Sequence, residues 1–248
     1  MKVKDYIISE LERADGGFIS GEQLAKKLNV TRQSVWKAIK SLQSDGYRID
    51  CVTNRGYALG RECDKLSSAV LEERTGMYVE AYKEVTSTNT LAKELFLKRG
   101  DCAIAAESQS DGRTKDGQNF PSPKDKGVYV SCAFSLNASA DCRRQVAEAC
   151  ESAVARLIAK LSGGRTQRRG NRIFADGKQV CGILTEGIVN LDSDELTCII
   201  VGTGVYTASV AEELGYVECA QRRNGLIADI CNALRSAISP FKKITVTS

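Results

Sequence analysis

The chain has 248 residues, enough for two domains that each bury a core. Its 35 Lys and Arg against 31 Asp and Glu give a charge of +4, which only weakly suggests an anionic partner. The absence of histidine excludes His-dependent catalysis, and ten cysteines without a Cys-x-x-Cys pair argue against a zinc site. No apolar run reaches the roughly 18 residues of a membrane span and no signal peptide follows Met1, so we expect a cytoplasmic protein with reduced cysteines.

Three short helices are predicted at the start of the chain. Residues 2–12 place apolar side chains on one helical face. Ser20 and Gln23 have the spacing of a capping box, which predicts the start of a second helix. Thr31 is a suitable N-cap for a third helix. The predicted inner face of that third helix consists of Val35, Ile39 and Leu42.

A β-hairpin follows, with predicted strands at 47–52 and 56–59. Helices joined by a turn and followed by a hairpin are typical of a winged helix-turn-helix, so residues 1–60 are predicted to bind DNA with the third helix in the major groove. The alternative is a winged helix that binds protein. We interpret Trp36 as a partly buried packing residue. The candidate DNA-binding residues are Arg32, Gln33, Ser34, Lys37 and Arg55.

Residues 61–77 are predicted to be a linker that becomes a short helix, and residues 78–248 a ligand-binding domain. Strand and helix patterns alternate there without a repeating βαβ unit, which predicts an α+β domain with a mostly antiparallel sheet. A helix is expected after Thr86-Ser87-Thr88-Asn89, whose side chains are interpreted as helix caps. Helices are also expected at 145–161, 210–214 and 226–238.

A polar loop joins the predicted strands 102–106 and 127–134. Its glycines allow the backbone to approach a ligand closely, and Arg113 and Lys115 suit a phosphate or a carboxylate. A mobile surface loop is the alternative. Taken alone, the loop favours the interpretation as a mobile surface loop. The motifs in the rest of the chain shift the interpretation toward a ligand-binding loop.

Several short motifs occur in an order that resembles the biotin protein ligase family. Ser87-Thr88-Asn89 matches a Ser-Thr-Asn motif at a helix start. Gln109 and Gly112-Arg113 match the start of the family's Gly-Arg-rich loop, and Ser122-Pro123 matches the motif after it. Residues 178–184 match the family's Lys-Lys-Val-x-Gly-Ile-Leu strand except at Gln179. The resemblance covers about residues 1–238. It is closest to the bifunctional kind that doubles as the biotin operon repressor.

This resemblance implies a winged helix-turn-helix followed by a class II synthetase-like mixed sheet. It also implies a homodimer that binds an operator, and a reaction that joins biotin to ATP as biotinyl-adenylate before transfer to a carrier protein. The biotin pocket that it implies consists of Ser87, Thr88, Asn89, Gln109, Gly112, Arg113 and Gly182. The adenylate loop that it implies includes Lys115 and Gly117, with Asn171 nearby.

The departures from the family concern catalysis. Gln179 stands where the family has its catalytic lysine, and Arg172 where it has the acid near ATP and metal. Tyr206 replaces an asparagine, and Asp116 replaces a loop arginine. The family's small C-terminal β-barrel is expected to be missing. Loss of one electrostatic donor typically lowers the rate of an enzyme by a factor of about 10²–10³. We therefore assign no catalytic residue and expect adenylation to be badly weakened or absent.

Three hypotheses follow. The first is a biotin-responsive repressor with a degenerate ligase domain, which needs no ATP, magnesium or carrier protein. The second is an active bifunctional ligase in which Arg168, Arg169 and Arg172 supply the lost charges. The third is a sensor of a different small carboxylic acid. The matching pocket residues favour biotin over the third hypothesis, and Gln179 and Arg172 favour the first over the second.

Overall fold

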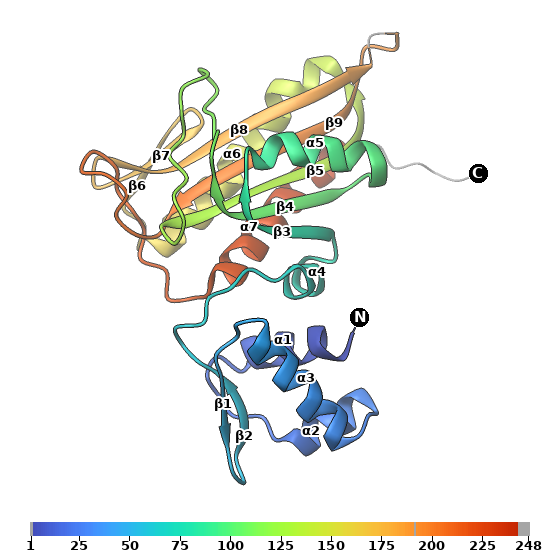
Figure 1. Cartoon of the computed structure of the whole chain (residues 1–248). Coiled ribbons are helices and arrows are strands. Elements are labelled where there is room, and N and C mark those ends of the chain that lie inside the picture. The colour runs from blue at the N-terminus through green and yellow to red at the C-terminus, as the bar shows by residue number, and fades with distance from the viewer. Residues whose placement is uncertain (1, 191, 243–248) are drawn as a thin grey trace.

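Three helices and a β-hairpin form the first part of the chain, the head, in a computed structural model that describes residues 2–190 and 192–242 (Figure 1). The head contains α1 (Val3–Arg13), α2 (Gly21–Leu28), α3 (Arg32–Ser44), β1 (Ile49–Val52) and β2 (Gly56–Leu59). β1 and β2 pair antiparallel, and Asn54 and Gly56 have positive φ in the turn region between them. The predicted winged helix-turn-helix architecture is confirmed.

The predicted caps in the head are present. Ser20 accepts a hydrogen bond from the backbone of Gln23 at 3.1 Å, and the Gln23 side chain accepts one from the backbone of Ser20 at 3.0 Å. Thr31 accepts from the backbone of Ser34 at 3.1 Å. These bonds satisfy N–H groups that lack partners in the first turn of a helix. The helices then bury a common core that includes Ile7, Leu11, Leu24, Val35, Ile39 and Leu42.

A seven-stranded sheet forms the second part, the ligand domain. Its strands are β3 (Tyr78–Val85), β4 (Cys102–Gln109), β5 (Gly127–Ser139), β6 (Thr166–Arg169), β7 (Arg172–Ala175), β8 (Lys178–Asn190) and β9 (Glu195–Tyr206). The spatial order is β3-β4-β5-β9-β8-β7-β6. β3 and β4 are parallel, and the other neighbouring strands are antiparallel. The predicted α+β class with a mixed sheet is confirmed.

Helices cover both faces of this sheet (Figure 1). α5 (Thr88–Arg99) packs on one face over β4, β5 and β9. α6 (Arg143–Leu161) and α7 (Arg223–Ile238) pack against each other and cover the opposite face. Short 3₁₀ turns at Ala140–Cys142 and Ser239–Phe241 precede α6 and follow α7. The main core lies between the sheet and α6 and α7, where alternate residues of β5 and β9 are buried.

Two predicted elements of the ligand domain are wrong. The helix predicted at 210–214 is absent, and Leu214 instead forms an isolated bridge with Gln179. Five residues are too few to form a stable helix without strong packing, and here Val210 and Leu214 pack beside Tyr206 as part of a loop. The strand predicted to end at Gly202 continues to Tyr206. β6 was not predicted.

The segment predicted as a linker helix contains α4 (Ser68–Thr75), which packs against both parts of the chain. Val70 joins the core of the head, whereas Leu71 joins the core of the ligand domain. α4 therefore fixes the head beside the sheet domain instead of acting as a free connection.

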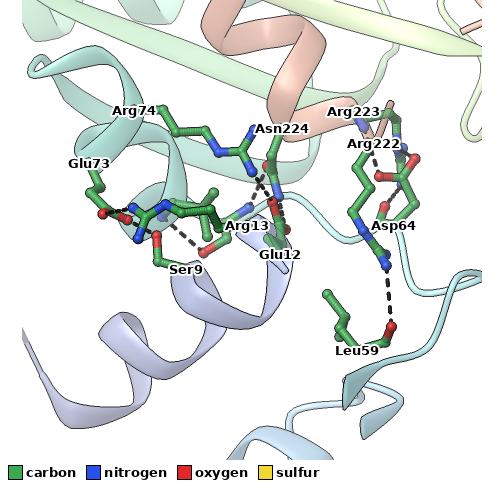
Figure 2. A network of polar contacts seen from close by, with 12 residues as sticks. Ser9, Glu12, Arg13, Leu59, Asp64, Glu73, Arg74, Arg222, Arg223 and Asn224 are labelled. Carbon is green, nitrogen blue, oxygen red and sulfur yellow. Dashed lines mark hydrogen bonds and ion pairs between the residues drawn. The ribbon is translucent and has the colours of Figure 1, made fainter. Parts of the chain in front are cut away.

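Polar side chains at the start of α7 complete the junction between the two parts (Figure 2). Asn224 has no exposed surface. It donates to Glu12 Oε1 at 2.6 Å and to the carbonyl of Lys65 at 2.8 Å, and it accepts from the backbone N–H of Ser67 at 3.1 Å. Burial raises the pKa of Glu12, although the bond from Asn224 and the charge of Arg74 oppose that shift.

Two arginines beside Asn224 bind the end of the wing and the segment after it. Arg222 donates to the carbonyl oxygens of Leu59, Gly60 and Cys63. Arg223 pairs with Asp64, with a nitrogen–oxygen distance of 3.1 Å (Figure 2). On the other side of the junction, Glu73 of α4 binds Ser9 and Arg13 of α1.

All ten cysteines are free thiols, and most are buried. Burial raises the pKa of Cys102 to about 11 and that of Cys150 to about 12, which keeps these thiols protonated and unreactive. Cys51 on β1 is exposed. In the described part of the chain, no helix has the length and apolar character needed to cross a bilayer.

Candidate functional site

A hollow of about 480 Å³, including its open mouth, lies where the start of α5, the β4–β5 loop and strands β8 and β9 meet. Six of the seven residues predicted for biotin line this hollow, namely Ser87, Thr88, Asn89, Gln109, Arg113 and Gly182. The seventh, Gly112, lies behind it, since a Cβ atom there would stand 3.1 Å from the Gln109 amide. Residues that lie 95 positions apart in the sequence are thus brought together.

A connected set of polar side chains, the polar belt, supports the wall of the hollow. Gln109 accepts from the Thr88 backbone and hydroxyl, both at 2.9 Å, and its amide donates to Ser122 at 2.9 Å. Ser131 Oγ lies 2.7 Å from Thr88 Oγ1 and 2.6 Å from Asn89 Oδ1. The polar belt consists of Ser122, Gln109, Thr88, Ser131, Asn89 and Glu186.

Helix capping does not account for the side chains at the start of α5, so that interpretation is wrong for Ser87 and Thr88. Ser87 occupies the N-cap position without forming a capping hydrogen bond. Thr88 instead directs its hydroxyl toward Gln109 on β4. Asn89 donates to Glu186 at 2.6 Å. Tertiary contacts therefore replace the local capping bonds, and the Ser87 side chain faces the hollow without a hydrogen bond among the described residues.

Phe120 forms one wall of the hollow, and glycines on two strands make room for it. A Cβ atom at Gly204 would stand 2.3 Å from the ring, and one at Gly182 would stand 2.6 Å from it. The ring stacks on Tyr206 with centroids 5.2 Å apart. Tyr206 is buried and donates its hydroxyl to the carbonyl of Pro121 at 3.0 Å. The returning arm of the loop is thereby held against β8 and β9.

The residues predicted for an adenylate loop separate in space. Asn171 lines the hollow and is held by its amide, which donates to the carbonyl of Ile183 at 2.8 Å. Lys115 faces a neighbouring cleft beside the first turn of α6, which Asn171 also lines. Gly117 lies at the loop tip with φ of +74° and nothing within 4 Å of its would-be Cβ. Only Asn171 of these three residues borders the hollow.

Gln179 lines the hollow, whereas Lys178 is exposed and donates to the carbonyl of Glu212 at 2.6 Å. The two side chains therefore point to opposite faces of the strand. Arg172 also lines the hollow and pairs with Asp116 of the loop at 3.0 Å. Arg113 pairs with Asp111 at 2.9 Å. Both cations at the mouth therefore have acidic partners.

The other two arginines proposed as substitute catalytic charges lie elsewhere. Arg168 pairs with Glu148 and Glu151 of α6. Arg169 lies over the ring of Phe174 at 5.0 Å. Of the three, only Arg172 lines the hollow.

No Asp or Glu is among the described residues that line the hollow. Magnesium in nucleotide sites is usually held through one or two carboxylates, with waters and phosphate oxygens. The residues present therefore do not fit a magnesium–nucleotide complex in this hollow. The neutral and cationic lining instead fits a small molecule with polar groups and one negative charge.

The predicted DNA-binding residues lie on the head, away from the hollow. Arg32, Gln33 and Lys37 are exposed along α3. Ser34 is half-buried, and its hydroxyl lies 2.9 Å from that of Thr31 at the helix cap. Arg55 is exposed in the wing turn, with its guanidinium 4.3 Å from the ring centroid of Phe18. The interpretation of Trp36 as a packing residue is wrong, because 51% of its surface is exposed.

Comparison with known proteins finds similarity in both the head and the ligand domain. The family described as HTH domain matches residues 4–58. The bifunctional ligase/repressor BirA of Bacillus subtilis is 27% identical over 207 residues, which cover 80% of this chain and 63% of the relative. BirA of Escherichia coli is 26% identical over 245 residues, which cover 93% of this chain and 75% of the relative.

The chain is therefore similar to the BirA ligase/repressors in both of its parts. The crystal structure of biotin protein ligase from Leishmania major in complex with biotinyl-5-AMP has the same fold in the ligand domain, with a TM-score of 0.52 and 18% identity over 66% of this chain and 76% of that one. The match to the Bacillus relative spans less than two thirds of that protein's length.

Some residues of the site were not predicted from the sequence. Phe120, Leu184, Gly202 and Gly204 line the hollow. The sequence signal for two of them is the alternation of glycines along β9. Gly202 and Gly204 lie on the same face of the strand, and their missing side chains admit Asn89 and Phe120.

Proposed function

We propose that this chain is a biotin-responsive DNA-binding regulator, a repressor, whose ligase-like domain binds biotin without joining it to AMP. The single observation that carries this proposal is the composition of the hollow. Six of the seven residues that the family resemblance assigns to biotin line it, while a neutral amide and an arginine stand at the positions of the catalytic lysine and the acid. A primary amide cannot provide the positive charge that carboxylate transfer to a phosphate requires.

The polar belt gives this hollow a preorganised wall. Its members are held by bonds of 2.6 to 2.9 Å from three strands, the loop and α5. Preorganised polar groups lower the entropic cost of ordering a site around a ligand. Arg113 at the mouth offers a guanidinium to the biotin carboxylate, in competition with Asp111.

The head supports the regulatory half of the proposal. Arg32, Gln33 and Lys37 are exposed along α3, as groups that reach bases and phosphates must be. The rigid junction around Asn224 joins this head to the ligand domain. A homodimer that presents two heads to paired half-sites completes the proposal, because helix-turn-helix proteins commonly bind in this way.

An active bifunctional ligase is the second candidate. The relatives described above carry that name, and Arg172 places one cation in the hollow. In that case the chain would consume ATP and transfer biotin to a carrier protein.

Calorimetric titration with biotin, alone and with Mg·ATP, followed by mass analysis of the bound material, separates the two candidates. We expect unchanged biotin in both samples. Biotinyl-adenylate in the second sample would contradict the proposal and establish the ligase. Binding of neither compound would direct the search to a different small carboxylic acid.

Gain of function provides a matched test. Gln179→Lys together with Arg172→Asp restores the residue types that the resemblance assigns to catalysis. We expect the double variant to form more biotinyl-adenylate than the parent chain in the same assay. Lys178→Gln is the control, because Lys178 points away from the hollow and its loss should change neither binding nor chemistry.

A further inference from the structure

Trp36 is the most exposed large apolar side chain of the head, with 51% of its surface accessible. Burying an indole contributes substantially to an interface, so a half-exposed tryptophan on a polar helix face is a candidate contact residue. The head's only other exposed large apolar side chain, among its described residues, is Val52 on the wing. Val52 and Arg32 border one cleft between α3 and the wing.

The position of Trp36 on α3 places it among cations. Arg32, Trp36 and Lys40 follow at intervals of four residues, so they form one row along the helix surface. Lys37 is exposed beside this row. α3 carries no acidic residue in its thirteen positions. A protein surface that is apolar at its centre would not require this purely basic surround, whereas a nucleic acid would.

We propose that Trp36 is a DNA-contact residue, whose indole packs against the apolar edges of bases in the major groove between the charged contacts of Arg32 and Lys40. Thymine offers a methyl group in that groove, and apolar side chains read it by contact. This inference rests on the proposed DNA binding and adds to it a residue that supplies shape and apolar contact instead of charge.

The chain contains a single tryptophan, so its fluorescence reports on this site alone. The full chain, with and without saturating biotin, is titrated with short random-sequence duplexes and with the sub-pool that it retains after rounds of selection, while the anisotropy of labelled DNA measures binding. Tryptophan emission and its quenching by iodide are recorded in the same samples. We expect bound DNA to change the emission and to protect Trp36 from iodide.

The outcomes distinguish this inference from the proposed function. If anisotropy shows binding while emission and iodide quenching stay unchanged, Trp36 does not contact DNA and the inference fails. If no duplex binds, the proposed function itself fails. If emission changes with protein concentration in the absence of DNA and does not respond to DNA, the surface pairs with a second copy of the chain, which also overturns the inference.

Variants test the apolar character of the contact. Trp36→Ala should weaken binding to the selected duplexes about tenfold, in the range expected for one good base contact, and Trp36→Phe should retain most of the affinity. Because the indole carries no charge, Trp36→Ala should leave the dependence of affinity on salt unchanged, whereas Lys37→Ala should lower that slope by about one.

Leu97→Ala is the matched control, because Leu97 is 71% exposed on α5 and far from α3 in the fold. It should bind DNA as the parent does. Denaturation midpoints of all variants check that the head remains folded. If Trp36→Ala binds as tightly as Leu97→Ala at matched stability, the contact is absent.

Discussion

The same pair of residues, an asparagine and a glutamate, occurs at the hollow and at the junction between head and ligand domain. Asn89 and Asn224 are each the second residue of a helix, and each donates to a glutamate at 2.6 Å. Glu12 is buried with Asn224, whereas Glu186 is exposed and Asn89 borders the hollow. The same type of hydrogen bond thus joins the head to the ligand domain at Asn224 and supports the wall of the hollow at Asn89.

The difference lies in what surrounds each pair. Asn224 uses its amide on Glu12 and Lys65 and its oxygen on Ser67, so the junction is closed by the chain itself. At the hollow, Ser87 and Gln179 face open space without side-chain hydrogen bonds among the described residues. Unused hydrogen-bonding groups beside a cavity indicate a ligand site, and complete satisfaction indicates a structural contact.

The largest expected effect is at the junction. Asn224→Ala should lower the free energy of unfolding by about 3 kcal/mol, because it leaves two buried backbone groups without a partner and the buried Glu12 carboxylate with only the 3.5 Å contact to Arg74 among the described residues. Denaturant titration measures this loss. Asn137→Ala, at an exposed position of β5, should change stability by less than about 0.5 kcal/mol. Equal losses of stability from the two substitutions would show that the hydrogen bonds of Asn224 do not stabilise the junction.

At the hollow the same substitution should cost less stability and more binding. Asn89→Ala should lower the free energy of unfolding by about 1–2 kcal/mol, because the exposed Glu186 can be solvated again. Calorimetry should show a loss of biotin affinity, which Asn224→Ala should largely retain at temperatures where it is folded. A stability loss at Asn89 as large as that at Asn224 would remove the distinction between the two sites.

The dependence of stability on pH also tests the junction, and its expected effect is smaller. Burial raises the pKa of Glu12 above its ordinary value of 4.5, so the folded state binds a proton more readily than the unfolded state. The resulting stability is fully present below pH 4.5 and is lost as pH rises through the folded-state pKa. Relative to Glu12→Gln, the parent should therefore gain stability on acidification from neutral pH. Thermal unfolding across that range tests the sign, with Glu186→Gln as the exposed control.

The smallest effect is expected at the mouth of the hollow. Asp116 and Arg172 form an ion pair in which Asp116 is well exposed, and such pairs contribute about 0–1 kcal/mol. Asp116→Asn should therefore leave stability nearly unchanged while freeing Arg172 for an anionic ligand. Higher affinity for biotin in calorimetry would support this role of Arg172, and an unchanged affinity would show that the ligand carboxylate binds elsewhere.

Local chemistry made much of the fold predictable. The capping box of Ser20 and Gln23, the N-cap at Thr31 and the hairpin of the head depend on neighbouring residues, and each is present. The Ser-Thr-Asn motif and the motifs of the β4–β5 loop and of β8 predicted six residues that line the hollow.

Long-range packing limited the remaining predictions. The need for glycine at 182 and 204 appears only when Phe120 folds back over both strands. The bond between Glu12 and Asn224 joins residues 212 positions apart, and no pattern in either segment indicates it. Trp36 lies at the flank of an amphipathic helix, where periodicity does not decide between core and solvent.

The distribution of thiols has a practical consequence for labelling. Cys51 is the one exposed cysteine among the ten, all of which lie in the described residues, and it is located on the wing, which packs beside α3. A maleimide dye should therefore attach first to the wing, without prior removal of the other cysteines. The natural sequence thus supplies an attachment point for measuring distances between this protein and a labelled duplex.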